Sequence, residues 1–425
     1  MKLRIQTRKR VSLDEVLMGI TTICVVLFAL LEHASISIPM VSSVKMPLMY
    51  LGGICILLRL IPLVGAIRKR RYFFVFVTLF ALCGLLLLTV FFNRNTRMGS
   101  FPLRSTARLI LYLVELFVLM VWAAETGRSK FILRFVFYGI LVLTVISDFL
   151  MLSRLLVFRN GRYESYLIGT KFTVSYFHLN LLAMWFYQNR ERVSSDRKAK
   201  RVVTLGIPYV AFVSIYVDCM TGLLGCVALI VLFLLLNTQI QRQLMRLNSP
   251  VLLILGLLAS VIFPFVAEIV ISIPGIATFL QETMHRDITL TGRMYIFNAF
   301  GRKMEGHWLW GYGYGNGNAV SESLFGYANA QNAMLQWILQ IGVPATCVLV
   351  FLMVMIFQQL SRHRNQSHNM AFVALIYVYI IMGTIETTFN MTFLMWFAII
   401  FLLVNEKKGP RCTEDFAAGK EIIRI

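Results

Sequence analysis

Long runs of apolar residues alternate with short polar segments along almost the whole chain. About twelve of these runs are long enough, at roughly 1.5 Å per residue, to cross a hydrocarbon layer of about 30 Å as helices. They lie near residues 14–33, 46–67, 72–92, 107–124, 131–152, 170–188, 202–218, 222–237, 250–273, 331–358, 369–386 and 390–404. The pattern predicts an all-α polytopic integral membrane protein, with residues 1–425 forming one membrane domain of about 12 transmembrane helices.

Short basic clusters separate many of the apolar runs and predict the orientation. The main clusters are Lys2–Arg10, Arg68–Arg71, Arg128–Arg134, Arg190–Arg201, Arg242/Arg246, Arg362/Arg364 and Lys407–Arg424. If both ends of the chain are cytoplasmic, these clusters all fall on the inner side, as the positive-inside rule requires. We therefore expect a cell-membrane protein with cytoplasmic tails at residues 1–13 and 405–425.

Composition supports this interpretation and restricts the partners. Hydrophobic residues make up 58% of the 425 residues and charged residues 14%, against roughly half and a quarter in soluble domains. In a soluble protein, the formal charge of +21 would suggest a nucleic-acid partner. Here the basic residues form the short clusters between apolar runs that predict the orientation, so we expect membrane lipids and no nucleic acid as partners. The seven cysteines lack the spacing of a metal site, so we expect buried thiols and no metal or cofactor.

One predicted external connection, residues 274–330, is far longer than the others. Loops of this length are usually functional or disordered, and its content of Tyr, Trp, Gly and Asn argues against disorder. Within it, Gly311–Asn318 alternates glycine with Tyr312, Tyr314, Asn316 and Asn318. Tyrosines offer faces for stacking and asparagines bind hydroxyls, so this segment is typical of a sugar-binding loop.

Ionisable residues inside the predicted spans are concentrated toward the external side. They are Asp148, Lys171, His178, Asp218, Glu268 and Glu386, whereas Glu115 lies near the midpoint of its span. Each is costly enough in a membrane to be a candidate for function, although residues near a helix end can also reach the interface. Lys171, Ser175 and His178 follow at i, i+4 and i+7, which places them on one helix face that we expect to look inward.

The predicted external loops also carry many arginines, whose planar guanidinium groups suit phosphate. The candidates for substrate binding include Arg154, Arg162 and Arg302. We interpret them as parts of an outward basic pocket for a phosphorylated lipid. Contact with anionic lipid head groups is the simpler alternative.

Several short motifs resemble those of a known family. They are Thr291–Arg293, Trp308–Gly315, Ala328–Asn332 and Gly342, with support from Gly169–His178 and Asp218–Gly222. Their order and spacing resemble the O-antigen polymerase and ligase superfamily, and within it the Wzy-type capsular and exopolysaccharide polymerases of Gram-positive bacteria. The resemblance covers roughly residues 145–345 and implies a GT-C-like helical architecture.

The resemblance implies polymerisation of polyprenyl-pyrophosphate-linked oligosaccharide repeat units on the outer face of the membrane. It implies Arg293 as the main ligand of the pyrophosphate, with Lys171, Arg154 or Arg162 assisting. The loop that contains Gln331 and Asn332 would bind substrate, and His178, Asp218 or Glu386 would accept the proton of the attacking hydroxyl. A flippase and a chain-length regulator would be partners.

Two departures from the family pattern limit what can be transferred. Many members carry His-Asn where this chain has Gln331-Asn332, and glutamine cannot act as a base. A Ser-Arg pair common in the family is replaced by Met220-Thr221. Two other functions stay open: a ligase that transfers a finished glycan with the same donor chemistry, and a transporter or flippase of two six-helix halves.

Overall fold

The computed structural model describes most of the chain and shows an all-α architecture. The described residues are 12–32, 39–94, 102–160, 163–195, 197–236, 244–271, 273–278, 282, 293–363 and 369–407. The first half contains α1 (Leu13–Leu30), α3 (Pro39–Leu57), α4 (Leu60–Ile67), α5 (Arg70–Phe92), α6 (Pro102–Thr126), α7 (Ser129–Leu152) and α8 (Lys171–Ser195). The second half contains α9 (Arg197–Tyr216), α10 (Met220–Leu236), α12 (Pro250–Ile271), α13 (Pro274–Thr278), α14 (Arg293–Lys303), α15 (Gly317–Phe325), α16 (Ala333–Arg362), α17 (Met370–Met382) and α18 (Met391–Asn405).

Five described helices are long and apolar enough to cross a membrane: α1, α5, α6, α7 and α16. The bent pair Ser43–Leu57 and Leu60–Ile67, which meet at 78°, would make a sixth span. The other apolar helices are shorter: Leu205–Tyr216, Met220–Leu235, Pro250–Val266, Met370–Met382 and Met391–Asn405. The all-α class with several membrane-spanning helices is therefore confirmed, whereas the count of twelve stays a prediction.

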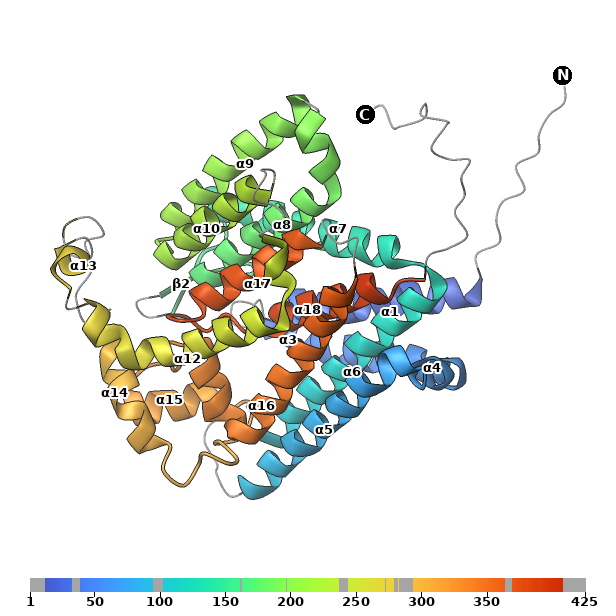
Figure 1. Cartoon of the computed structure of the whole chain (residues 1–425), viewed down its shortest axis with the longest axis horizontal. Coiled ribbons are helices and arrows are strands. Elements are labelled where there is room, and N and C mark those ends of the chain that lie inside the picture. Colours follow the sequence, from blue (N-terminus) through green and yellow to red (C-terminus); the bar gives the residue numbers. More distant parts are fainter. Residues whose placement is uncertain are drawn as a thin grey trace, which may run out of the picture.

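Helices at the outside of the bundle expose large apolar side chains, whereas helices at its centre bury theirs. Large apolar side chains such as Phe73, Phe74 and Phe80 of α5 are exposed, as expected for a surface that faces hydrocarbon chains. By contrast, α17 and α18 are buried on nearly all sides, and α18 packs against α6 and α16. These two helices form the centre of the bundle (Figure 1).

A small antiparallel sheet, which the sequence did not predict, joins α7 to α8. It consists of β1 (Phe158–Asn160), β2 (Tyr163–Tyr166) and β3 (Gly169–Thr170) in the order β1-β2-β3, with Phe158 opposite Ser165 and Ser165 opposite Thr170. β3 leads directly into α8 at Lys171. The sheet therefore fixes where α8 begins.

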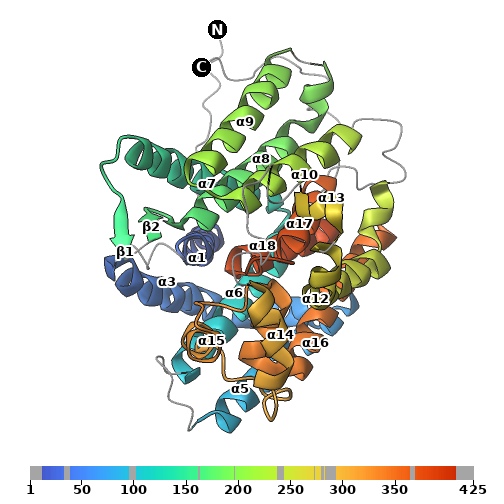
Figure 2. The ribbon, with the colours of Figure 1, turned by 90° about the vertical axis from the view of Figure 1, so that its left-hand side faces the viewer.

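The described part of the long loop, residues 293–330, packs around a hydrophobic cluster that it shares with Leu335, Ile338 and Leu339 of α16. Ile296, Phe297 and Phe300 of α14 pack with Val320 and Phe325 of α15. Figure 2 views the molecule from the side on which α14 and α15 lie. These residues agree with the predicted ordered cap, while most of 279–292 lies outside the described residues.

Gly342 anchors this cap to α16. Its backbone has a positive φ of 74° and kinks the helix, and a Cβ at this position would lie 2.2 Å from the carbonyl oxygen of Leu309. The amide of Val343 donates to the carbonyl of Trp308 at 2.8 Å, and the amide of Tyr312 donates to the carbonyl of Leu339 at 2.8 Å. Only glycine allows so close an approach with this backbone geometry.

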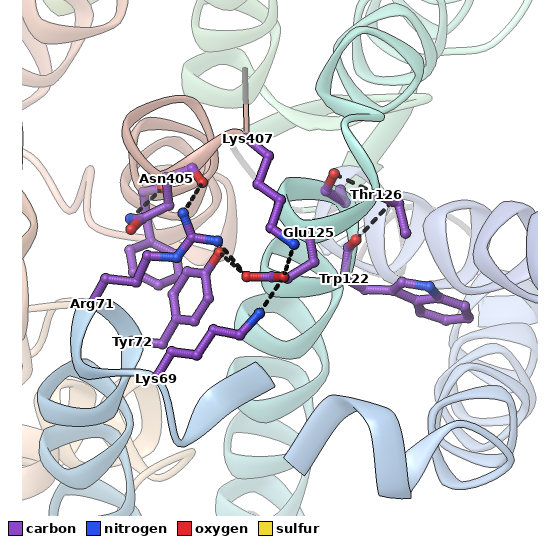
Figure 3. A network of polar contacts seen from close by, with 10 residues as sticks. Lys69, Arg71, Tyr72, Trp122, Glu125, Thr126, Asn405 and Lys407 are labelled. Carbon is purple, nitrogen blue, oxygen red and sulfur yellow. Dashed lines mark hydrogen bonds and ion pairs between the residues drawn. The ribbon is translucent and has the colours of Figure 1, made fainter. Parts of the chain in front are cut away.

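The opposite end of the bundle is held by an ionic network around Glu125 of α6 (Figure 3). Its carboxylate accepts from Lys69 Nζ at 2.5 Å, Lys407 Nζ at 2.6 Å and Tyr72 Oη at 3.1 Å, and also from Arg71. The network joins α5 and α6 to the segment after α18. Residues of the predicted inner loops thus gather at one end of the molecule, and the cap lies at the other.

Candidate functional site

The starts of three helices and the connection before α18 meet beneath the cap. α8 begins at Lys171, α10 at Met220 and α14 at Arg293, and each contributes a side chain near Glu386. The unpaired amide groups at a helix N-terminus favour a negative charge. Three such helix starts contribute side chains near Glu386, and two of these side chains, Arg293 and Lys171, are cationic.

Arg293, which is partly buried, and Glu386, which is buried, form an ion pair at the centre of the region. The guanidinium donates through Nη2 to Glu386 Oε1, with side-chain exposures of 19% for Arg293 and 4% for Glu386. Arg293 Nε also donates to Gln331 Oε1 at 3.0 Å. An arginine held this way presents a planar set of donors in fixed orientation. The structure therefore brings together three of the predicted residues: Arg293, Glu386 and Gln331.

Lys171 lies beside this pair and binds Asp218. Its Nζ donates to the Asp218 carbonyl at 2.8 Å and to Oδ2 at 3.1 Å. Asp218 adopts a positive φ of 51° in the turn between α9 and α10, and its side chain is 72% exposed. This carboxylate is solvated and paired, so the geometry does not favour it as a base.

Glu386 lies in the connection between α17 and α18 rather than within a helix. Burial raises its pKa to about 7, while the charges of Arg293 and Lys171 and a hydrogen bond from Thr221 act to lower it. A base that ionises near neutral pH is suited to accept a proton under physiological conditions. Of the three predicted bases, Glu386 therefore has the environment that fits this role best.

His178 lies elsewhere, in a buried triad between α7, α8 and α9. Its Nε2 is 2.9 Å from Asp148 Oδ2, its Nδ1 is 2.8 Å from the carbonyl of Val174, and Tyr209 Oη donates to Asp148 Oδ2 at 2.7 Å. The ring is only 1% exposed, and both of its nitrogens are occupied. The arrangement does not support His178 as a base that reaches substrate.

The three residues predicted to share one face of α8 thus contact different neighbours. Lys171 faces Asp218, Ser175 packs against Gly222, and His178 faces Asp148. The shared helix face predicted that the three side chains line one common surface. In the structure, each of them contacts a residue of a different neighbouring segment. Only Lys171 joins the region around Arg293.

The remaining predicted arginines do not join this cluster. Arg154 is 59% exposed and lies 3.6 Å from Glu164, and its guanidinium covers the Tyr216 ring at 5.7 Å. Arg302 is exposed on α14. Arg162 lies outside the described residues, as does the side chain of Glu268. The expectation that arginines from several loops form one pocket is supported in part, because Arg293 lies in this cluster and Arg108, from another predicted external loop, lines the cavity beside it.

Three of the predicted substrate-binding residues are used inside the protein. Tyr312 donates to the Lys303 carbonyl at 2.7 Å, and the fully buried Asn316 donates to the Tyr312 carbonyl at 3.2 Å. Asn332 caps α16 by accepting from the Leu335 amide, and it donates to the carbonyls of Ser260 and Thr384. These contacts favour structural roles, because buried amides that already have partners cannot bind a sugar.

A cavity of about 380 Å³ adjoins the cluster. Tyr314 borders it and stacks on Trp337 with ring centroids 5.9 Å apart. The lining residues that the sequence analysis did not single out as site residues include Glu32, Lys45, Arg108, Asn329, Gln336 and Gln340. Gln336 and Gln340 are four residues apart, so their shared helix face was a signal available in the sequence.

Within the described part of the chain, no group of three or more His, Cys, Asp or Glu side chains is arranged to hold a metal ion. Of the cysteines, Cys24, Cys55, Cys83, Cys219 and Cys226 are buried, as expected, whereas Cys347 is exposed. Cys412 lies outside the described residues.

Comparisons with known proteins give no relative for this chain. No family model, no curated protein and no solved structure matches it. The resemblance to O-antigen polymerases and ligases thus rests on the short motifs alone, of which Arg293, Gln331 and Gly342 have structural roles described above.

Proposed function

We propose that this protein is a membrane glycosyltransferase that polymerises oligosaccharide repeat units carried on polyprenyl pyrophosphate. The observation that carries the proposal is the ion pair of Arg293 and Glu386, placed where helix N-termini converge. In this proposal the cap faces the cell exterior, the Glu125 network faces the cytoplasm, and the product is a capsular or exopolysaccharide.

The reaction needs a stabilised leaving group and an acceptor for one proton. The hydroxyl oxygen of the incoming unit attacks the anomeric carbon of the growing chain, and the bond between that carbon and the phosphate oxygen breaks. The bonding electrons move to the pyrophosphate, where Arg293 and Lys171 stabilise the added negative charge. Glu386 accepts the hydroxyl proton.

The ion pair links these two roles. A pyrophosphate bound to Arg293 competes with Glu386 for the same guanidinium donors. Its arrival releases the carboxylate within the reaction site, where Glu386 can accept the proton of the attacking hydroxyl. Arg293 would keep its hydrogen bond from Nε to Gln331 Oε1, so that the guanidinium stays oriented while its partner changes.

The proposal implies membrane partners of two kinds. A flippase must deliver lipid-linked repeat units to the side on which the cap lies, and a chain-length regulator would act on the same product. A ligase would use the same donor chemistry, and no contact in the structure favours it over a polymerase.

Deletion of the gene, followed by sizing of lipid-linked and surface glycans, tests the proposal. A single repeat unit should persist while the ladder of longer chains disappears. Accumulation of repeat units on the cytoplasmic side would instead show that flipping is the lost step and would overturn the proposal. An unchanged ladder would overturn it as well.

A further inference from the structure

The cavity beside the Arg293 cluster has a chemistry of its own. It is lined by α1, α3, α6, α16 and the segments around Tyr314 and Phe389. Two hydrogen bonds connect it to the cluster: Arg293 Nε donates to Gln331 Oε1 at 3.0 Å, and Gln331 Nε2 donates to Asn329 Oδ1 at 2.8 Å. A group in the cavity would therefore lie next to one held at Arg293.

Three amide side chains in this cavity are fixed with their donor groups available. The Gln336 oxygen accepts from the Ala330 amide at 2.8 Å, the Gln340 oxygen accepts from the Gly315 amide at 3.2 Å, and the Asn329 oxygen accepts from the Gln331 amide at 2.9 Å. Among the described residues, the NH₂ groups of these three side chains have no acceptor. The cavity therefore offers donors and needs a ligand rich in acceptors.

The charges in the cavity also favour a ligand with acceptor groups. Lys45 Nζ donates to the Glu32 carbonyl at 2.6 Å and interacts electrostatically with Glu32, the carboxylate in the lining, and with Arg108. The buried Arg108 Nε has no hydrogen-bond partner in the described part of the chain. Two cations against one carboxylate leave a net charge of +1, which matches one carboxylate better than a pyrophosphate.

Aromatic rings complete the cavity. Trp337 stacks with Tyr314 and donates its indole N–H to the Phe389 carbonyl at 2.9 Å, which fixes the ring. Gly317 leaves room for the amides, since a Cβ there would lie 2.5 Å from Gln336 Nε2. Rigid aromatic faces beside oriented donors are suited to a sugar ring.

We propose that this cavity is a subsite for an acidic sugar, in which Arg108 and Lys45 bind the carboxylate and the three amides bind ring and hydroxyl oxygens. The inference rests on the proposed function, because that function makes the ligand a saccharide. It adds that the repeat unit carries a uronic acid or a sugar with an equivalent carboxylate next to the reacting linkage.

Binding of a matched pair of probes to the purified full-length protein tests this subsite. The probes are cellobiouronic acid and cellobiose, which differ only by a carboxylate in place of a hydroxymethyl group, titrated by saturation-transfer difference NMR at low salt. The acid should bind about tenfold or more tightly, since bonds to charged groups are stronger than neutral ones. Equal binding of the two probes would overturn the proposal.

Two variants locate the bound carboxylate. Arg108→Gln removes the cation, and Gln340→Glu retains the acceptor for the Gly315 amide while replacing the donor by a negative charge. Both should abolish the preference for the acid. The matched controls Arg104→Gln and Gln358→Glu, at exposed positions on the same helices, should retain it.

The remaining outcomes are also decisive. A preference that survives both cavity variants but disappears in Arg293→Lys would place the carboxylate at Arg293 and overturn the subsite. A preference that depends on Arg108, in a protein whose gene deletion leaves glycan length unchanged, would support the subsite and overturn the polymerase. The two proposals can therefore fail separately.

Discussion

The two ends of the bundle both carry clustered charges, but the ratio of cationic side chains to carboxylates differs between them. At one end, the Glu125 carboxylate receives three cationic side chains and a tyrosine hydroxyl. At the other, one arginine meets one carboxylate, and both are more deeply buried. Glu125 has no capacity left for another partner, whereas the pair Arg293 and Glu386 can exchange partners with a ligand.

This difference separates a structural cluster from a candidate reactive one. A carboxylate surrounded by donors from α5, α6 and the segment after α18 holds those elements together. A buried pair costs desolvation, and it is weak evidence for stability. Its position beside a donor-rich cavity is in keeping with the ligand-binding role proposed above. The comparison predicts that changes at one end affect turnover and changes at the other affect stability.

The largest effect is expected for Arg293→Lys. A lysine keeps the charge but loses the planar donors and the hydrogen bond to Gln331, so activity should fall by about 10² to 10³. The measurement is polymer length in cells, with the membrane level of the protein determined in parallel. Arg302→Lys, an exposed change on the same helix, is the control. Wild-type polymer length in Arg293→Lys would refute the phosphate role.

Glu386→Gln should reduce activity by about 10² at pH 8 and by less at pH 6. The proposed base must be ionised, and burial raises its pKa to about 7, so the wild-type kcat/KM should rise with pH through about 7. The variant should lose that rise. Lipid-linked repeat units extracted from the deletion strain serve as substrate. A variant that retains the wild-type pH profile would show that another group is the base.

Glu125→Gln should leave activity of the folded protein unchanged but lower stability by about 1.5–3 kcal/mol, since several bonds to a charged group are weakened. Thermal unfolding in detergent measures this effect. Glu15→Gln weakens a partly exposed pair with Arg128 but retains an acceptor for the Ser12 amide at the start of α1, so it should change stability by less than about 1 kcal/mol. A larger loss for Glu15→Gln would contradict the comparison.

Reporter fusions define the sides of the membrane on which the two ends of the bundle lie. A fusion at Ser195, in the predicted inner connection, and one at Gly315, in the cap, should report opposite sides. The same side for both would refute the predicted topology.

Much of the helical framework could be predicted from the sequence, because continuous apolar runs directly encode membrane-spanning helices. Each predicted run coincides with at least part of a helix. The ordered cap could also be predicted from its aromatic and glycine content. The sheet before α8 could not, because its strands of two to four residues carry no detectable alternation.

The candidate site was predicted less completely. Arg293, Glu386 and Gln331 were identified and lie together, whereas His178 was assigned to the same face as Lys171 and lies in a separate triad. The cavity was missed because Lys45, Arg108 and Asn329 come from segments far apart in the chain. Neither spacing nor composition brings such residues together.

The sequence by itself determined the class of the protein, since burial of apolar side chains in lipid depends on local composition. It also determined which residue types were unusual inside the apolar runs. Only the tertiary structure decided which of these met. In the tertiary structure, Glu386 pairs with Arg293, His178 is buried in the bundle, and the amides of Asn329, Gln336 and Gln340 line one cavity. These contacts depend on how helices that are distant in the sequence pack together.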